Sequence, residues 1–132
     1  MSKEDGKAKS YAIVIGAILT LVGILGFVRG HAGMEMMGVS LQFSVIHNII
    51  HLATGLVGLA LRYTSDGKYA REFPQIFGVI YTLVAVLGFA HLPGFVVSML
   101  NLNTAYNLIH LILGVLGLLA GFTSSARKPA TA

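Results

Sequence analysis

Two segments of twelve residues, NIIHLATGLVGL at 48–59 and NLIHLILGVLGL at 107–118, decide the fold of this chain. They share the pattern N-x-x-H-L-x-x-G-x-x-G-L at an offset of 59 residues. Because each segment lies inside a long apolar run, the pattern predicts an asparagine and a histidine at membrane depth. Polar groups are costly there, and those that occur generally have a structural or functional reason to be present.

The composition of the chain is that of a membrane protein. Of its 132 residues, 55% are apolar and only 11% are charged. The mean hydropathy of +0.80 lies far above that of an ordinary soluble domain. We therefore expect the lipid bilayer to surround most of the chain.

Four apolar runs are long enough to cross a bilayer, which needs about 20 helical residues. They cover residues 11–28, 41–61, 75–92 and 100–122. The runs are continuously apolar and lack the alternation of a barrel wall, so strands are disfavoured. The sequence predicts an all-α membrane protein, a single four-helix transmembrane domain over residues 1–132 with short tails at 1–10 and 123–132.

Residues typical of helix starts occur near the beginnings of three of these runs. Pro74 suits the first turn of the third helix, where its missing amide hydrogen costs nothing. Ser40 is the predicted N-cap of the second helix, and either Asn103 or Thr104 that of the fourth, because their side-chain oxygens can accept from free backbone amides. These signals place His51 about 15 Å, and His110 about 10 Å, below the start of its helix.

The basic residues predict the orientation in the membrane. Eight of the nine lysines and arginines flank the runs on one side, and the positive-inside rule makes that side, with both termini, cytoplasmic. The same distribution explains the basic pI without a nucleic-acid partner, since the charges are divided among three short segments. The eight are Lys3, Lys7, Lys9, Arg62, Lys68, Arg71, Arg127 and Lys128, and the exception is Arg29.

A second repeat joins the first and third runs. GAILTLVGILGF at 16–27 and GVIYTLVAVLGF at 78–89 agree at eight of twelve positions, at an offset of 62. The first run is therefore expected to be a permanent span, and it exceeds the 7 to 15 apolar residues of a signal peptide. The chain is interpreted as two parallel-repeat helical hairpins with pseudo-twofold symmetry about the membrane normal, an up-down-up-down four-helix bundle.

The doubled pattern also resembles a known family. The run HNIIHLATGLVGLALR at 47–62, its echo YNLIHLILGVLGLLAG at 106–121, and the LGF endings at 25–27 and 87–89 are similar to the bacterial membrane family catalogued as domain of unknown function 4383. The resemblance covers about residues 11–122. It implies a small four-span protein of a bacterial inner or photosynthetic membrane, and it supplies no catalytic residues.

Each copy of the motif places its polar and small residues on one stripe of its helix. On a helix with 100° between residues, the four positions fall within an arc of about 80°. Small residues allow transmembrane backbones to approach, and asparagine or histidine can bond across the interface. The helix-packing interpretation applies above all to Asn48, Gly55, Gly58, Asn107, Gly114 and Gly117.

The two histidines of the stripes also permit a cofactor-binding interpretation. His51 and His110 lie on equivalent helices, so they could ligate one haem from two sides, or two chlorin pigments separately. His47 is an additional or alternative ligand. A proton or solute path is less favoured, because no Asp, Glu, Lys or Arg lies within any span.

The loop after the first span offers a different ligand set. Imidazole and thioether groups suit Cu⁺, but an apolar loop at the membrane interface explains the same methionines without a metal. No metal site is therefore predicted. The loop residues concerned are His31, Met34, Glu35, Met36 and Met37.

Catalysis is not expected. The chain has no cysteine, and it lacks the recognised zinc-protease, phosphate-loop and nucleophile-elbow patterns. Its loop carboxylates are isolated. Two function classes remain: a non-catalytic accessory or structural subunit that packs against other subunits of a respiratory or photosynthetic complex, and a haem- or chlorin-binding electron-transfer or pigment protein.

Overall fold

The computed structural model describes residues 3–30, 34–36, 38–42, 44–64, 69 and 71–124. Four of its helices are long and apolar enough to cross a membrane. Two short strands follow the first of them, and a short helix precedes the last. In chain order the elements are α1 (Lys3–Arg29), β1 (Met34–Met36), β2 (Val39–Leu41), α2 (Val45–Tyr63), α3 (Glu72–Phe89), α4 (Gly94–Met99) and α5 (Thr104–Phe122).

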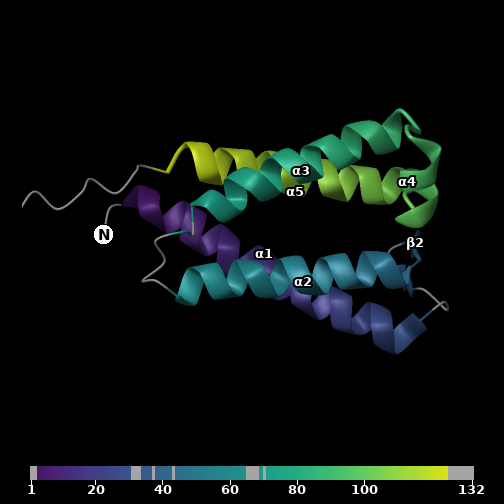
Figure 1. The fold of residues 1–132 in the computed structure, drawn as a ribbon, viewed down its shortest axis with the longest axis horizontal. Coiled ribbons are helices and arrows are strands. Elements are labelled where there is room, and N and C mark those ends of the chain that lie inside the picture. The colour runs from purple at the N-terminus through teal and green to yellow at the C-terminus, as the bar shows by residue number, and fades with distance from the viewer. Residues whose placement is uncertain are drawn as a thin grey trace, which may run out of the picture.

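The four long helices pack as two pairs. Helix α1 lies along α2, and α3 lies along α5, so that each pair is a hairpin of helices consecutive among the spans (Figure 1). Contacts between the pairs are fewer and run mainly from α1 to α5 and α3. We call α1 with α2 the first hairpin and α3 with α5 the second hairpin.

Glycines bring the helices of each hairpin into backbone contact. A methyl group added at Gly55 of α2 would lie 2.5 Å from the backbone nitrogen of Thr20 in α1. A methyl group at Gly114 of α5 would lie 2.4 Å from Oγ1 of Thr82 in α3. Helices this close have no room for a side chain at these positions, as is common where transmembrane helices associate.

Larger side chains fill the space between the hairpins. The buried core is built on Tyr11, Ile15 and Leu19 of α1 and on aromatic residues of α3. Phe77 and Tyr81 stack with their ring centroids 3.8 Å apart. The Tyr11 hydroxyl donates a hydrogen bond of 2.5 Å to the Leu113 carbonyl, which links the first hairpin to the second.

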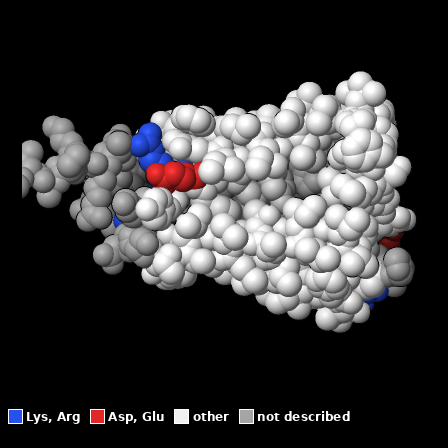
Figure 2. Space-filling model, viewed as in Figure 1, with Lys and Arg blue, Asp and Glu red and all other residues white. Residues whose placement is uncertain are grey.

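The outer surface of the bundle is apolar along the spans. Each long helix exposes large aliphatic residues, among them Leu21, Leu56, Leu83 and Ile112, each more than half exposed. Figure 2 shows one face of the molecule, on which the coloured charged side chains lie only near the two ends. The apolar middle matches the hydrocarbon layer of a membrane.

The second span begins later than the sequence predicts. Helix α2 starts at Val45 with Ser44 as its N-cap, so the prediction of a span from residue 41 with Ser40 as the cap is wrong. Ser40 lies instead in β2, opposite Glu35 of β1. The antiparallel strands turn near Gly38, whose φ of +78° suits glycine. Leu41, at the end of β2, is buried and forms a core cluster with Tyr106.

Other boundaries also differ from the prediction, since α3 ends at Phe89 and not at 92, and α5 begins at Thr104 and not at 100. Asn103, one of the two predicted N-caps, accepts from the Tyr106 amide at the start of α5. Helix α3 begins at Glu72 and carries Pro74 in its first turn, as predicted. Helix α1 extends back to Lys3, so much of the predicted tail at 1–10 is helical. Burial of Ala8 explains this extension, because it gives the extra helical turns a packing surface.

Candidate functional site

Three histidine rings meet between the hairpins, in the half of the bundle nearer to β2 and α4. His47 and His51 lie one helical turn apart and therefore share a face of α2, and His110 approaches from α5. The ring centroid of His47 lies 4.3 Å from that of His51 and 5.6 Å from that of His110. One ring nitrogen from each histidine can be chosen so that all three lie within 4.8 Å of one another. We call these three residues the histidine cluster.

The depths of His51 and His110 are equal. Each is the seventh residue of its helix, about 9 Å along the axis from the first residue. The sequence predicts a similar depth for both, but its distances of about 15 Å and 10 Å from the helix starts differ because the predicted second helix begins four residues too early. The structure also settles the direction of both rings, which lie inside the bundle with a ring-centroid separation of 6.5 Å.

Burial leaves part of the histidine cluster without hydrogen bonds. The exposed fractions of His47, His51 and His110 are 4%, 7% and 3%. The Nδ1 atoms of His51 and His110 are buried and find no hydrogen-bond partner among the described residues. Buried polar atoms are nearly always paired, so two unpaired imidazole nitrogens in one cluster are unusual.

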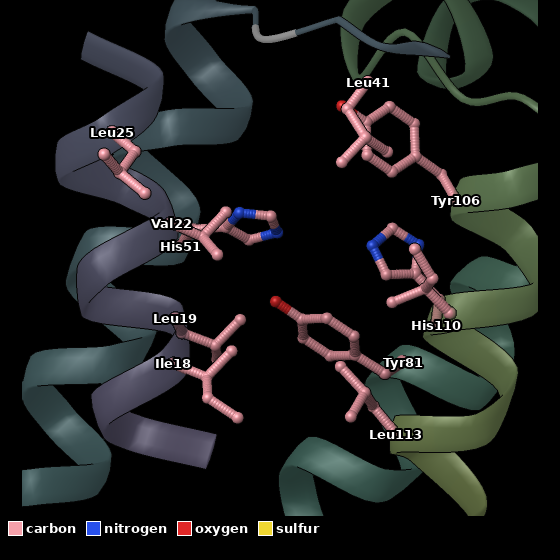
Figure 3. A pocket seen from close by; sticks show the side chains of 11 residues that line it. Ile18, Leu19, Val22, Leu25, Leu41, His51, Tyr81, Tyr106, His110 and Leu113 are labelled. Atoms are coloured by element: carbon pink, nitrogen blue, oxygen red, sulfur yellow. The ribbon is translucent and has the colours of Figure 1, made fainter. Parts of the chain in front are cut away.

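Two tyrosines complete the site. The Tyr106 ring lies 5.1 Å from His47, and its hydroxyl donates a 2.7 Å hydrogen bond to the Gln42 carbonyl just beyond β2. The Tyr81 ring lies 5.1 Å from His110. Figure 3 shows the Tyr81 hydroxyl directed toward the first hairpin, below His51, with Tyr106 on the opposite side of His110 from Tyr81.

Neither tyrosine is among the site residues predicted from the sequence. Tyr81 stands at a mismatched position of the repeat, where the first hairpin has Leu19. Tyr106 stands where the other motif has His47. Each tyrosine is a polar aromatic residue at a position where the two copies of the repeat differ. This difference is the feature of the sequence that could have indicated a site residue.

A small cavity adjoins the histidine cluster. Its volume is about 170 Å³. His51, His110, Tyr81 and Tyr106 contribute to its wall, and aliphatic residues such as Leu19 and Val22 of α1 form much of the rest (Figure 3). The site therefore combines a few nitrogen and oxygen atoms with an apolar lining.

The cavity does not fit a macrocycle. Pockets for drug-sized ligands and cofactors occupy about 300 to 1,000 Å³, well above the volume here. The His47 ring also fills part of the space beside His51 and His110. Separate pigments outside the bundle would need outward imidazoles, whereas these are buried. The residues present therefore do not fit a haem or a chlorin as the helices stand.

The asparagines of the two stripes face the partner helix of their own hairpin. Asn48 and Asn107 are buried, and their side chains lie against Gly26 and Gly88, where an added methyl group would overlap them. Their Oδ1 atoms have no hydrogen-bond partner among the described residues. These two residues therefore contact the hairpin interface and do not enter the histidine cluster.

The last glycine of each stripe contacts an aromatic side chain of the other hairpin, and Gly117 also contacts α3 of its own hairpin. Gly58 of α2 lies under the Phe73 ring of α3, and Gly117 of α5 lies beside the Tyr11 hydroxyl of α1 and the Pro74 carbonyl. A single stripe thus makes three kinds of contact along its length. Its asparagine and first glycine meet the hairpin partner, its histidine meets the cluster, and its second glycine receives an aromatic side chain.

Among the outer-loop residues considered as metal ligands, only Glu35 has a described side chain. Glu35 is exposed in β1. His31 and Met37, and the side chains of Met34 and Met36, lie outside the described residues.

Comparison with known proteins gives a family. The family model described as Domain of unknown function (DUF4383) matches residues 9–123, which include all three members of the histidine cluster. No curated protein and no solved structure matches the chain. Because the family match covers most of the sequence, the chain belongs to this family.

Proposed function

We propose that this member of the DUF4383 family is a non-catalytic accessory or structural subunit that packs within a larger bioenergetic membrane complex, respiratory or photosynthetic. The observation that carries the proposal is the outward apolar surface of all four spans. Leu21, Leu56, Leu83 and Ile112 represent this surface on α1, α2, α3 and α5. Such a surface suits contacts with the spans of other subunits, for which small helical proteins without large loops are well shaped.

The proposal of a non-catalytic role is supported by the chemistry of the buried site. The one group of potential metal or acid-base ligands found in the described part of the chain consists of three histidines, with no carboxylate. Its neighbours are tyrosines and aliphatic side chains. General acid-base or nucleophilic catalysis commonly pairs such an imidazole with a carboxylate or a nucleophile.

We further propose that the protein resides in a bacterial inner, or photosynthetic, membrane with both termini on the cytoplasmic side. The basic residues support this orientation. Arg62 at the end of α2 and Arg71 before α3 lie at the same end of the bundle as the start of α1 (Figure 1). Arg29 lies at the opposite end of α1.

The proposed origin of the bundle is a duplicated hairpin with pseudo-twofold symmetry. Contacts at corresponding positions support it. Gly26 meets Asn48 in the first hairpin, and Gly88 meets Asn107 in the second, at offsets of 62 and 59 residues. The haem- or chlorin-ligand role is not carried further, because the cavity volume does not support it.

Photochemical cross-linking in native membranes tests the subunit proposal. A photoreactive phenylalanine analogue is placed singly at Leu21, Leu56, Leu83 or Ile112, one exposed position on each span. The matched control carries it at Tyr81, which is buried. We expect one or two of the exposed positions to cross-link to the same partner chain, identified by mass spectrometry as a component of a respiratory or photosynthetic complex. The control is expected to yield only adducts within the chain.

Other cross-linking results would contradict all or part of the proposal. If all four exposed positions give lipid adducts alone, and the wild-type protein migrates as a free chain in mild detergent, the subunit proposal is wrong. Cross-links to a partner outside bioenergetic complexes would support the subunit role but contradict the proposed class of complex.

A further inference from the structure

The histidine cluster has a composition that the packing of a subunit does not require. We propose that His47, His51 and His110 together bind one copper(I) ion. This inference goes beyond the proposed subunit function and does not depend on it. It rests on the convergence of three buried imidazoles from two helices, and on the unpaired Nδ1 atoms of His51 and His110.

The spacing of the nitrogens is close to that of a metal site. Metal–imidazole bonds of about 2.0 to 2.1 Å place the nitrogens of neighbouring ligands about 3.4 Å apart. In the histidine cluster one nitrogen from each ring already lies within 4.8 Å of the others. The rings would therefore need to close by no more than about 1.4 Å on binding. Rotation of the side chains is enough for this, and the adjoining cavity leaves space for it.

The surroundings of His47 support its role as a ligand. Its imidazole interacts with the backbone carbonyl of Leu100, to which a ring N–H can donate. Metal-bound histidines almost always make such a bond with their second nitrogen, which fixes the tautomer and directs the first nitrogen at the metal. Leu100 follows α4, so the connection between α3 and α5 provides this bond.

The charge of the site favours Cu⁺ over a divalent ion. All three ligands are neutral, and no carboxylate joins them in the described part of the chain. The cost of transferring an ion from water to an apolar medium rises with the square of its charge, so a divalent ion without an anionic ligand is penalised most. Imidazole is a good ligand for copper, and three-ligand copper sites are well known.

The apolar wall strengthens this choice. A catalytic zinc site with three histidines keeps a water molecule in its fourth position. Here the adjoining space is lined largely by aliphatic side chains such as Leu19 and Val22, which offer water no hydrogen bonds. A three-coordinate ion without bound water is the better match to this lining.

Transfer of Cu⁺ from a coloured chelator tests the inference. The full-length protein is reconstituted in lipid nanodiscs under anaerobic conditions and titrated into the Cu⁺ complex of bicinchoninate, whose absorbance reports the copper that remains. We expect removal of one Cu⁺ per chain, and an X-ray absorption spectrum with nitrogen scatterers alone at about 2.0 Å. A parallel titration uses Zn²⁺ with a zinc-sensitive dye.

The variants separate the histidine cluster from other histidines. His51→Phe and His110→Phe keep an aromatic ring in each packing position and remove its nitrogens. Each is expected to lower Cu⁺ affinity by about 100-fold or more, because even the loss of a partner of a ligand costs about 10- to 100-fold. His91→Phe is the matched control, since His91 is exposed and lies outside the cluster. Circular dichroism establishes that each variant is folded.

Three results would overturn the inference. The wild type would fail to take Cu⁺ from the chelator, or the folded His51→Phe and His110→Phe variants would take it as well as the wild type. A preference for Zn²⁺ over Cu⁺ at the same histidines would overturn the choice of ion. Because the titration uses the isolated protein, its failure is independent of the cross-linking result in native membranes.

Discussion

The two hairpins share their contacts but differ where they face one another. At an offset of 59 residues, Ser44 and Asn103 cap α2 and α5, and each accepts from the backbone amide three residues later. Farther along these helices, Gly55 and Gly114 each touch a threonine of the partner helix. The helix caps and the glycine–threonine contacts are therefore repeated in both hairpins.

The differences lie at the histidine cluster. The first hairpin supplies His47 where the second has Tyr106, and it supplies Leu19 where the second has Tyr81. All four residues are buried near the space between the hairpins. The same caps and glycine–threonine contacts thus support different residues at these two positions between the hairpins, although His51 and His110 are the same in both. The site can therefore be asymmetric on a repeated scaffold.

The largest loss of stability is expected from substitution of the paired glycines Gly55 and Gly114. Gly55→Ala would place a methyl group 2.5 Å from the backbone nitrogen of Thr20, and Gly114→Ala would place one 2.6 Å from the backbone nitrogen of Thr82. Overpacking against backbone should lower the free energy of unfolding by about 3 kcal/mol in each variant. Denaturation by sodium dodecyl sulfate in mixed micelles, followed by circular dichroism, measures it.

Gly6→Ala is the control for these two variants, because an added methyl group at Gly6 meets nothing within 4 Å. It should leave the stability unchanged or slightly higher, as alanine favours a helix over glycine. A difference of more than about 1.5 kcal/mol between Gly55→Ala and Gly114→Ala would exceed ordinary context effects and would show that the two glycine–threonine contacts are not equivalent.

A smaller difference in stability is expected between corresponding substitutions on α1 and α3, which form the opposite side of each hairpin interface. A methyl group at Gly78 of α3 would lie 2.5 Å from the Leu118 nitrogen, whereas one at Gly16 of α1 would lie 3.1 Å from its nearest atoms in α2. Gly78→Ala should therefore cost about 2 kcal/mol more than Gly16→Ala. The same denaturation experiment compares them, and equal losses would contradict the closer approach of helices in the second hairpin.

The smallest effect concerns the helix caps. Ser44→Ala and Asn103→Ala each remove the side-chain acceptor at the start of a helix, which should cost about 1 kcal/mol. Ser44→Ala should cost slightly more, because the Ser44 hydroxyl also donates to the Met99 carbonyl. Thermal unfolding in detergent measures the losses, and Ser44→Asp and Asn103→Asp, which retain a capping oxygen, should recover most of them. A larger loss of stability in Asn103→Ala than in Ser44→Ala would contradict the expected order.

Much of the scaffold could be read from the residues themselves. The spacing of Asn48, His51 and Gly55 put them on one helix face, and all three are buried. The error at Ser40 arose because capping signals are short and frequent. Ser40 and Ser44 are chemically equivalent caps, and only the pairing of β1 with β2 excludes the first.

The candidate site could be predicted only in part. His47, His51 and His110 were identified as possible ligands, but their common meeting point was not. Tyr81 was not among the predicted ligands, although its ring lies 5.1 Å from that of His110 and its hydroxyl reaches below His51 (Figure 3). The unpaired nitrogens and the small cavity depend on atoms from both hairpins, so no pattern within one helix could indicate them.

The sequence by itself determined that the chain forms membrane-spanning helices and which residues share a stripe, because helix length and residue spacing follow directly from the geometry of the α-helix. Only the tertiary structure decided where each part of a stripe points. In a bilayer, apolar residues are tolerated on every side of a helix, so hydropathy does not fix its rotation. The contacts of Gly55 and Gly114 within the hairpins fix it instead, and they turn His51 and His110 toward each other.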